Sequence, residues 1–207
     1  MKLTVKAGRG EKIHLHIDGE YFLTVDNGYL AELGIYNGMD VDCEDIEKLR
    51  VNIGARRAYN KAVDLLSRRD HSRKELLDKL RQKGYGEYAV EAIEKLADYG
   101  YIDDRRFARI FAEELIRLKS YGKKRVEREL YRKGVERDII CEVISECDFP
   151  SEKLAEIIER KYSRYLNDEK GVNKTVNALL RLGYTYTEIR DAIREIADRE
   201  DFENTYE

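Results

Sequence analysis

The chain has few of the residues that interrupt helices or cross-link chains. Its 207 residues include one proline, Pro150, which in a charge-rich chain with helical periodicity indicates a mainly α-helical fold. The three cysteines, Cys43, Cys141 and Cys147, are odd in number and widely spaced, which favours a reducing compartment over a disulfide framework. No segment approaches the roughly 18 apolar residues of a transmembrane helix, and the amino terminus lacks a signal-peptide core. These absences predict a cytoplasmic protein without a membrane segment.

The sequence also lacks the motifs of common enzyme classes. It contains no phosphate-binding glycine loop, no Gly-x-Ser-x-Gly elbow and no His-Glu-x-x-His pair. His14 and His16 share one face of a predicted strand, but no further metal ligand accompanies them. Asp103 and Asp104 are adjacent at a predicted helix start, where capping and the helix dipole explain acidic residues better than catalysis does. We therefore expect no catalytic residue, no metal and no cofactor.

The chain does contain a 13-residue pattern that occurs three times, at residues 72–84, 122–134 and 171–183. The copies are offset by 50 and 49 residues, and self-similarity at such a period indicates a repeat architecture. Each copy has leucine at its ninth position and glycine at its last. The coinciding residues are Leu80, Leu130 and Leu179, and Gly84, Gly134 and Gly183.

Each copy reads as an amphipathic helix that a terminal glycine ends in the left-handed conformation. Ser72 is a suitable N-cap for the first copy. Apolar residues with helical spacing precede and follow each copy, so the repeating unit has three helices. The predicted fold is mainly α, with tandem three-helix repeats at 55–101, 102–147 and 148–200 that form an elongated, curved array. An acidic tail at 201–207 is expected to fray.

Residues 1–54 form a separate amino-terminal extension in this prediction. Ile13, Leu15 and Ile17 alternate with polar residues, and the Asp18-Gly19 turn signal leads into a second β-favouring run at 21–25. Residues 3–5 supply a third strand, and a short helix is predicted at 29–33. A longer helix begins near residue 46, with Gly54 as a break before the first repeat.

Short connections between the repeats predict close packing. We expect Asp103 or Asp104 to cap the first helix of the second repeat, and Tyr101 and Ile102 to fill the joint before it. Ser151 is the expected N-cap of the third repeat.

The net charge of −3 conceals an uneven distribution. Residues 1–54 and 148–207 are each net −4, whereas residues 55–147 are net +5. Within that middle region, residues 56–83 carry 10 basic and 4 acidic side chains, and residues 117–133 carry 8 and 2. Such a concentration of positive charge predicts a polyanionic partner or an acidic protein surface.

The basic residues of the first two repeats are the candidate binding residues. A solvated helical face is the alternative, although such faces usually carry both signs of charge. The corresponding face of the third repeat is much less basic. The candidates are Arg68, Arg69, Arg73, Lys74, Arg81, Lys83, Lys123, Lys124, Arg125, Arg128 and Arg132.

Three motifs resemble a known family. Ser-Arg-x-Glu-Leu-x-x-Lys-Leu-x-x-Lys-Gly at 72–84, Tyr-Ile-Asp-Asp-x-x-Phe-Ala at 101–108 and Gly-x-x-Arg-Val-x-x-Glu-Leu-x-x-Lys-Gly at 122–134 are similar in order and spacing to the RecX family of RecA regulators. The resemblance covers residues 55 to about 200 and is weakest in the third repeat, where Gly171 and Thr175 replace the basic capped helix.

The resemblance implies a non-enzymatic regulator in DNA repair, recombination and the SOS response. Family members bind the RecA–single-stranded DNA filament, lie along its groove and usually inhibit strand exchange, ATP hydrolysis and co-protease activity; some also bind DNA directly. We therefore expect RecA in its nucleoprotein filament as the partner, weak and sequence-independent contact with single- or double-stranded DNA, and a monomeric chain. A helical nucleic-acid-binding module without a RecA role is the alternative, and a helical scaffold would leave the charge distribution unexplained.

Overall fold

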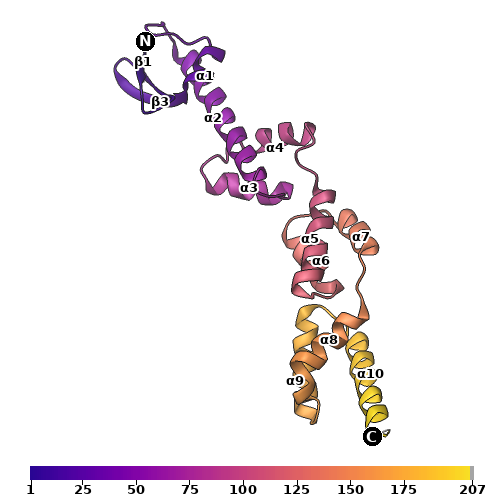
Figure 1. The fold of residues 1–207 in the computed structure, drawn as a ribbon. Coiled ribbons are helices and arrows are strands. Elements are labelled where there is room, and N and C mark those ends of the chain that lie inside the picture. The colour runs from indigo at the N-terminus through magenta and orange to yellow at the C-terminus, as the bar shows by residue number, and fades with distance from the viewer. Residues whose placement is uncertain (206–207) are drawn as a thin grey trace. The chain divides into compact units, whose positions relative to one another are not determined.

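The computed structural model describes the backbone of residues 1–205 and the side chains of residues 1–199 (Figure 1). Within that range the chain forms ten α-helices, a short 3₁₀ helix and three strands, which confirms the mainly α fold with a small β extension. Two compact units are present: one combines residues 1–64 and 80–95, and the other combines residues 65–79 with the chain from residue 96 onward.

The extension is an antiparallel sheet of β1 (Leu3–Ala7), β2 (Lys12–Ile17) and β3 (Glu20–Asp26), in that order. Asp18 and Gly19 both have positive φ angles, +48° and +89°, as the predicted tight turn between β2 and β3 requires. α1 (Asn27–Glu32) follows, close to the predicted short helix. The apolar core of the extension consists of buried side chains from the three strands, from the loop between α1 and the next helix, α2, and from α2 itself. These are Leu3, Leu15, Val25, Ile35, Val41 and Ile53.

α2 (Cys43–Leu66) runs through residue 54 without interruption, so the break predicted at Gly54 is wrong. A side chain at Gly54 would collide with the ring of Tyr88, so the glycine provides space for that ring. The predicted limit between residues 54 and 55 therefore falls inside one helix, and the domain limits stay predictions. Three arginines of α2 lie against the extension: Arg50 over the Phe22 ring, Arg56 over the Tyr29 ring and Arg57 on the carbonyl oxygen of Thr24.

The remaining helices follow in three groups. They are α3 (Arg73–Gln82) and α4 (Ala89–Asp98); α5 (Asp104–Lys119), α6 (Lys123–Arg132) and α7 (Arg137–Glu146); and α8 (Ser151–Tyr162), the 3₁₀ helix η1 (Ser163–Tyr165), α9 (Glu169–Leu182) and α10 (Tyr186–Thr205). α5–α7 enclose one apolar core and α8–α10 enclose another. The aligned Leu80, Leu130 and Leu179 are each fully buried.

Helix ends confirm some predictions and correct others. Gly84, Gly134 and Gly183 all have positive φ angles, and Asp103 caps α5 by accepting the backbone N–H of Arg106. Ser151 is the first residue of α8 and makes no cap hydrogen bond, so its predicted role is wrong. α9 begins at residue 169, before the 13-residue pattern, with Asp168 as its cap.

Two further differences concern Tyr101 and the carboxyl terminus. Tyr101 is 59% exposed and contacts Tyr99 edge-on, so it does not fill a joint between repeats. The backbone of α10 continues to Thr205, into the predicted acidic tail. The side chains of that tail and its last two residues lie outside the described part of the chain.

Candidate polyanion-binding site

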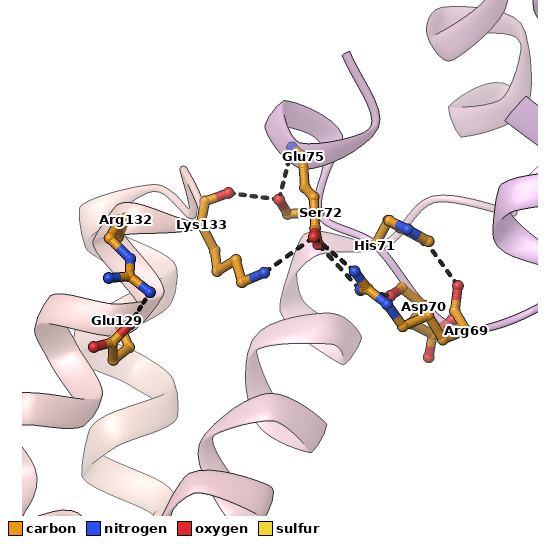
Figure 2. A network of polar contacts seen from close by, with 8 residues as sticks. All are labelled: Arg69, Asp70, His71, Ser72, Glu75, Glu129, Arg132 and Lys133. Atoms are coloured by element: carbon orange, nitrogen blue, oxygen red, sulfur yellow. Dashed lines mark hydrogen bonds and ion pairs between the residues drawn. The ribbon is translucent and has the colours of Figure 1, made fainter. Parts of the chain in front are cut away.

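The N-terminal end of α3 lies against the C-terminal end of α6, and this contact is called the first joint here. Ser72 has two roles in it (Figure 2). Its Oγ accepts the backbone N–H of Glu75 at 3.1 Å, which caps α3 as predicted, and donates to the carbonyl oxygen of Lys133 at 2.5 Å. A single hydroxyl therefore ends one helix and fastens it to the next repeat.

Glu75 forms the ionic centre of the first joint. Its carboxylate accepts two hydrogen bonds from the Arg69 guanidinium, at 2.7 and 3.1 Å, and one from Lys133 Nζ at 3.0 Å (Figure 2). The Glu75 side chain is only 15% exposed. Burial raises the pKa of Glu75, but hydrogen bonds from Arg69 and Lys133 and their charges outweigh it, so that the pKa falls from 4.5 to about 2. The carboxylate therefore stays ionised across the physiological range.

Neighbouring contacts extend the first joint. The aliphatic part of Lys74 lies over Gly134, where an added side chain would collide with it. Asp104 accepts the backbone N–H of Arg73 at 2.7 Å. His71 is buried with Nδ1 2.9 Å from the Arg69 carbonyl oxygen, and burial lowers the pKa of its imidazole. The segment from Arg69 to Glu75 is thus held by side chains at several points.

A second joint has the same topology but different chemistry. Here the N-terminal end of α6 meets the C-terminal end of α9. The backbone N–H of Gly122 donates to the carbonyl oxygen of Leu182 at 2.9 Å, and that of Lys124 to Gly183 at 3.2 Å. The C-terminal end of α9 thus accepts the N–H of the α6 cap residue and one N–H from the first turn of α6, which has no acidic residue in that turn.

Arg125 belongs to the second joint rather than to the outer surface. Its side chain is only 28% exposed, and its guanidinium donates to the carbonyl oxygen of Arg181 at 2.9 Å, lies 4.6 Å from the centre of the Tyr121 ring and pairs with Glu129. Arg125, one of the candidate binding residues, is thus held in the second joint, because it lies at the start of α6 where that helix meets the end of α9.

The outer face of α6 is basic over its whole length. Lys124, Arg128 and Arg132 are spaced four residues apart and are exposed, and Tyr131, on the same side of the helix, is 73% exposed. Arg132 pairs with Glu129 at 2.8 Å. Among the side chains that the structure describes, Lys124 and Arg128 have no carboxylate within ion-pair distance. We call Lys124, Arg128, Tyr131 and Arg132 the α6 basic face.

The structure distributes the other candidates between the two units. The unit that contains the α6 basic face also contains five other candidates, all of them exposed: Arg68, Arg69, Arg73, Lys74 and Lys123. One of these, Arg69, forms an ion pair with Glu75. Arg81 and Lys83 belong to the other unit and are also exposed.

Sequence reasoning missed Lys133 and Glu75 as a pair. Ser72 followed by Glu75 matches a capping box, which predicts that Glu75 turns back to the start of its own helix. Instead, Glu75 binds Arg69 and Lys133. No local pattern indicates Lys133, because the contact joins residues 58 positions apart.

Two other features are absent from the described residues, a metal-binding cluster and a membrane-spanning helix. In the described part of the chain, no three or more histidine, cysteine, aspartate or glutamate side chains form a group that could hold a metal ion. Among the same residues, no helix has both the length and the apolar character needed to cross a membrane.

The joints and cores define a protein built from tandem three-helix domains. Residues 58–96 match the family model "RecX, first three-helix domain", and residues 103–144 match "RecX, second three-helix domain". The regulatory protein RecX of Caldanaerobacter subterraneus subsp. tengcongensis is 34% identical over 190 residues, which cover 91% of this chain and 95% of that protein. The chain belongs to the RecX family of regulatory proteins.

Other relatives agree with this assignment. RecX of Listeria innocua is 36% identical over 150 residues, which cover 70% of this chain but only 56% of that longer protein. A crystal structure of RecX from Lactobacillus salivarius is 28% identical over 70% of this chain and 97% of the other, with a TM-score of 0.61. Another crystal structure of a regulatory protein RecX shares the fold, with a TM-score of 0.68 at 20% identity over 92% of this chain and 98% of the other.

Proposed function

We propose that this protein is a non-enzymatic regulator that binds the RecA–single-stranded DNA filament in the cytoplasm and inhibits its recombinase, ATPase and co-protease activities. Family membership supports the regulatory role. The α6 basic face carries the proposal further, because Lys124 and Arg128 are exposed cations without an acidic partner among the described residues. Such cations fit filament phosphates or acidic side chains of RecA.

The α6 basic face also combines charge with an aromatic side chain. Tyr131 is 73% exposed between Arg128 and Arg132, so a base exposed in a single strand could stack on its ring. Phosphate contacts from this face would be independent of sequence and sensitive to salt. The alternative, in which α3 and α4 act as a helix-turn-helix that inserts α4 into a DNA groove, is less well supported. α4 carries the exposed acidic residues Glu91 and Glu94, which DNA phosphates would repel.

The single-stranded-DNA-dependent ATPase rate of RecA, titrated with this protein at two salt concentrations, tests the proposal. We expect inhibition at substoichiometric amounts. The double variant Lys124→Glu, Arg128→Glu should raise the half-inhibitory concentration by roughly tenfold or more, equivalent to about 1.4 kcal/mol. Lys161→Glu with Lys170→Glu, an equal charge change at exposed positions of the third repeat, is the matched control.

Each outcome has a defined meaning. An unchanged ATPase rate at excess protein, together with salt-sensitive DNA binding, would favour the nucleic-acid-binding module without a RecA role. Equal loss of inhibition in the α6 variant and in the control would reject the α6 basic face as the contact surface.

A further inference from the structure

The first joint holds a nearly buried carboxylate between two cations that differ in their exposure. Glu75 is 15% exposed, whereas Arg69 is 50% and Lys133 is 25% exposed. Within the described part of the chain, no backbone–backbone hydrogen bond connects α3 with α6. The polar contacts between them are made by the side chains of Ser72, Glu75, Arg69 and Lys133, which we call the latch, and Lys74 packs over Gly134 beside it.

Further positive charge adjoins the latch. Arg73 and Lys74 are exposed at the first turn of α3, and Arg132, which precedes Lys133, is exposed at the end of α6. These side chains form the part of the molecule to which a phosphate backbone is attracted. A phosphate that reaches this part comes close to Arg69 and Lys133, and it can accept the same charge-assisted hydrogen bonds as Glu75.

A phosphate and Glu75 therefore compete for the same donors. If a phosphate takes Arg69 and Lys133, the carboxylate of Glu75 is left charged and nearly buried, which is unfavourable. Glu75 then has to turn into solvent, and its movement disturbs the N-terminal turn of α3, where Ser72 binds the carbonyl oxygen of Lys133. Closure of the latch and binding of a phosphate at these donors are thus mutually exclusive.

We propose that the latch is anion-responsive: nucleic-acid phosphates displace Glu75 from Arg69 and Lys133 and release the start of α3 from the end of α6. This inference rests on the proposed function, because it gives the filament DNA a second effect besides attachment to the α6 basic face. Coupling of this kind is reciprocal, so a chain whose latch is weakened in advance binds the polyanion more tightly.

The first test is binding of a fluorescein-labelled 30-nucleotide oligo(dT) without RecA, over a range of NaCl concentrations. We expect Glu75→Gln to bind more tightly than Glu156→Gln, which makes the same charge change at an exposed position of α8, away from the α6 basic face. The gain in affinity arises because the variant has no carboxylate that competes with the phosphate for Arg69 and Lys133. Equal affinities for the two variants overturn the inference.

The second test uses the wild-type protein, so that it remains decisive if Glu75→Gln does not fold. Hydrogen–deuterium exchange with and without oligo(dT) should show faster exchange at the Glu75 amide, which Ser72 Oγ accepts, in the bound state. The Gly122 and Lys124 amides, bonded to α9 carbonyls, are the internal control and should keep their protection. Unchanged or slower exchange at Glu75 overturns the inference.

The two proposals fail separately. A RecA ATPase rate that the protein does not change rejects filament regulation but leaves the exchange result at the latch intact. Conversely, inhibition of the ATPase without faster exchange at Glu75 keeps the proposed function and rejects the latch.

Discussion

The two joints differ in the groups that close them, although equivalent segments of the repeats form both. At the second joint, backbone N–H groups of α6 meet backbone carbonyls of α9 across Gly122 and Gly183. At the first joint, the hydroxyl of Ser72 and the carboxylate of Glu75 make the contacts with α6. The first joint therefore depends on ionisation and competing ions, whereas the second depends mainly on how closely two backbones approach.

One pair of equivalent positions accounts for much of this difference. Glu75 and Arg125 each follow the cap of their helix by three residues. The acidic residue binds cations from the neighbouring segment and from α6, and the basic residue donates to a carbonyl oxygen at the end of α9. A single charge reversal at one repeat position thus changes which groups of the next repeat are bound.

The largest expected effect concerns the cores rather than the joints. Leu80, Leu130 and Leu179 are equally buried, so replacement of any one by Ala should lower the free energy of unfolding by about 2–5 kcal/mol. Leu180→Ala, at an exposed neighbour in α9, should change it by less than about 0.5 kcal/mol. Urea denaturation followed by circular dichroism measures both. A small effect at Leu130 alone would mean that the repeats differ in their cores as well as in their joints.

Alanine substitutions of the glycines that end the 13-residue segments allow the two joints to be compared by their effect on the free energy of unfolding. An alanine pays about 1–2 kcal/mol for the left-handed conformation at Gly84, Gly134 or Gly183. Gly84 has open space around it, so Gly84→Ala should cost little more. At Gly134 the added group meets the Lys74 side chain as far back as its Cβ, which the α3 backbone holds in place, so Gly134→Ala should cost more than Gly84→Ala. At Gly183 the added group meets the Arg125 backbone. Loss of the two adjacent hydrogen bonds there should bring the total to about 3–4 kcal/mol.

Thermal or urea unfolding of the three alanine variants gives this order. Gly84→Ala serves as the control, because it reports the conformational cost without a collision. Equal destabilisation by all three substitutions would contradict the close backbone approach at the second joint.

Acid should distinguish the first joint from the second. The folded-state pKa of Glu75, about 2, lies below the ordinary value of 4.5, so its stabilisation is complete above pH 4.5 and is lost as the pH falls towards 2. The shift corresponds to stabilisation on the order of 3 kcal/mol. Urea unfolding of the wild type between pH 5 and pH 2 should show this loss.

Glu75→Gln should show a correspondingly flatter pH dependence over the same range, and Glu127→Gln should behave like the wild type. If the pH dependence of Glu75→Gln matches that of the wild type, the carboxylate is not the acid-sensitive group of the first joint.

Local signals in the sequence predict much of this fold. The β2–β3 turn follows from Asp18-Gly19, the cap of α5 from Asp103, and the helix ends from glycines that adopt positive φ. Each depends on a residue and its near neighbours along the chain, which periodicity and capping rules describe well.

The errors occur where distant residues determine the environment. Gly54 resembles a helix break until Tyr88 is seen to occupy the space beside it. Arg125 resembles its exposed neighbours until α9 is placed against it, and Glu75 resembles an ordinary capping-box residue until Lys133 approaches. The basic composition predicts a charged surface, but it does not separate the cations held in the joints from those of the α6 basic face.

The space that Gly54 leaves for Tyr88 has a consequence for synthesis on the ribosome. The amino-terminal unit is discontinuous, because residues 80–95 complete it after residues 65–79 have already been made for the other unit. The emerging sheet and the first half of α2 therefore wait for the Tyr88 segment before their contacts are complete, and the nascent chain reaches that stage only after about 95 residues have left the exit tunnel. A pause in translation before that point would leave the surface of α2 at Gly54, which the Tyr88 ring later covers, exposed for longer.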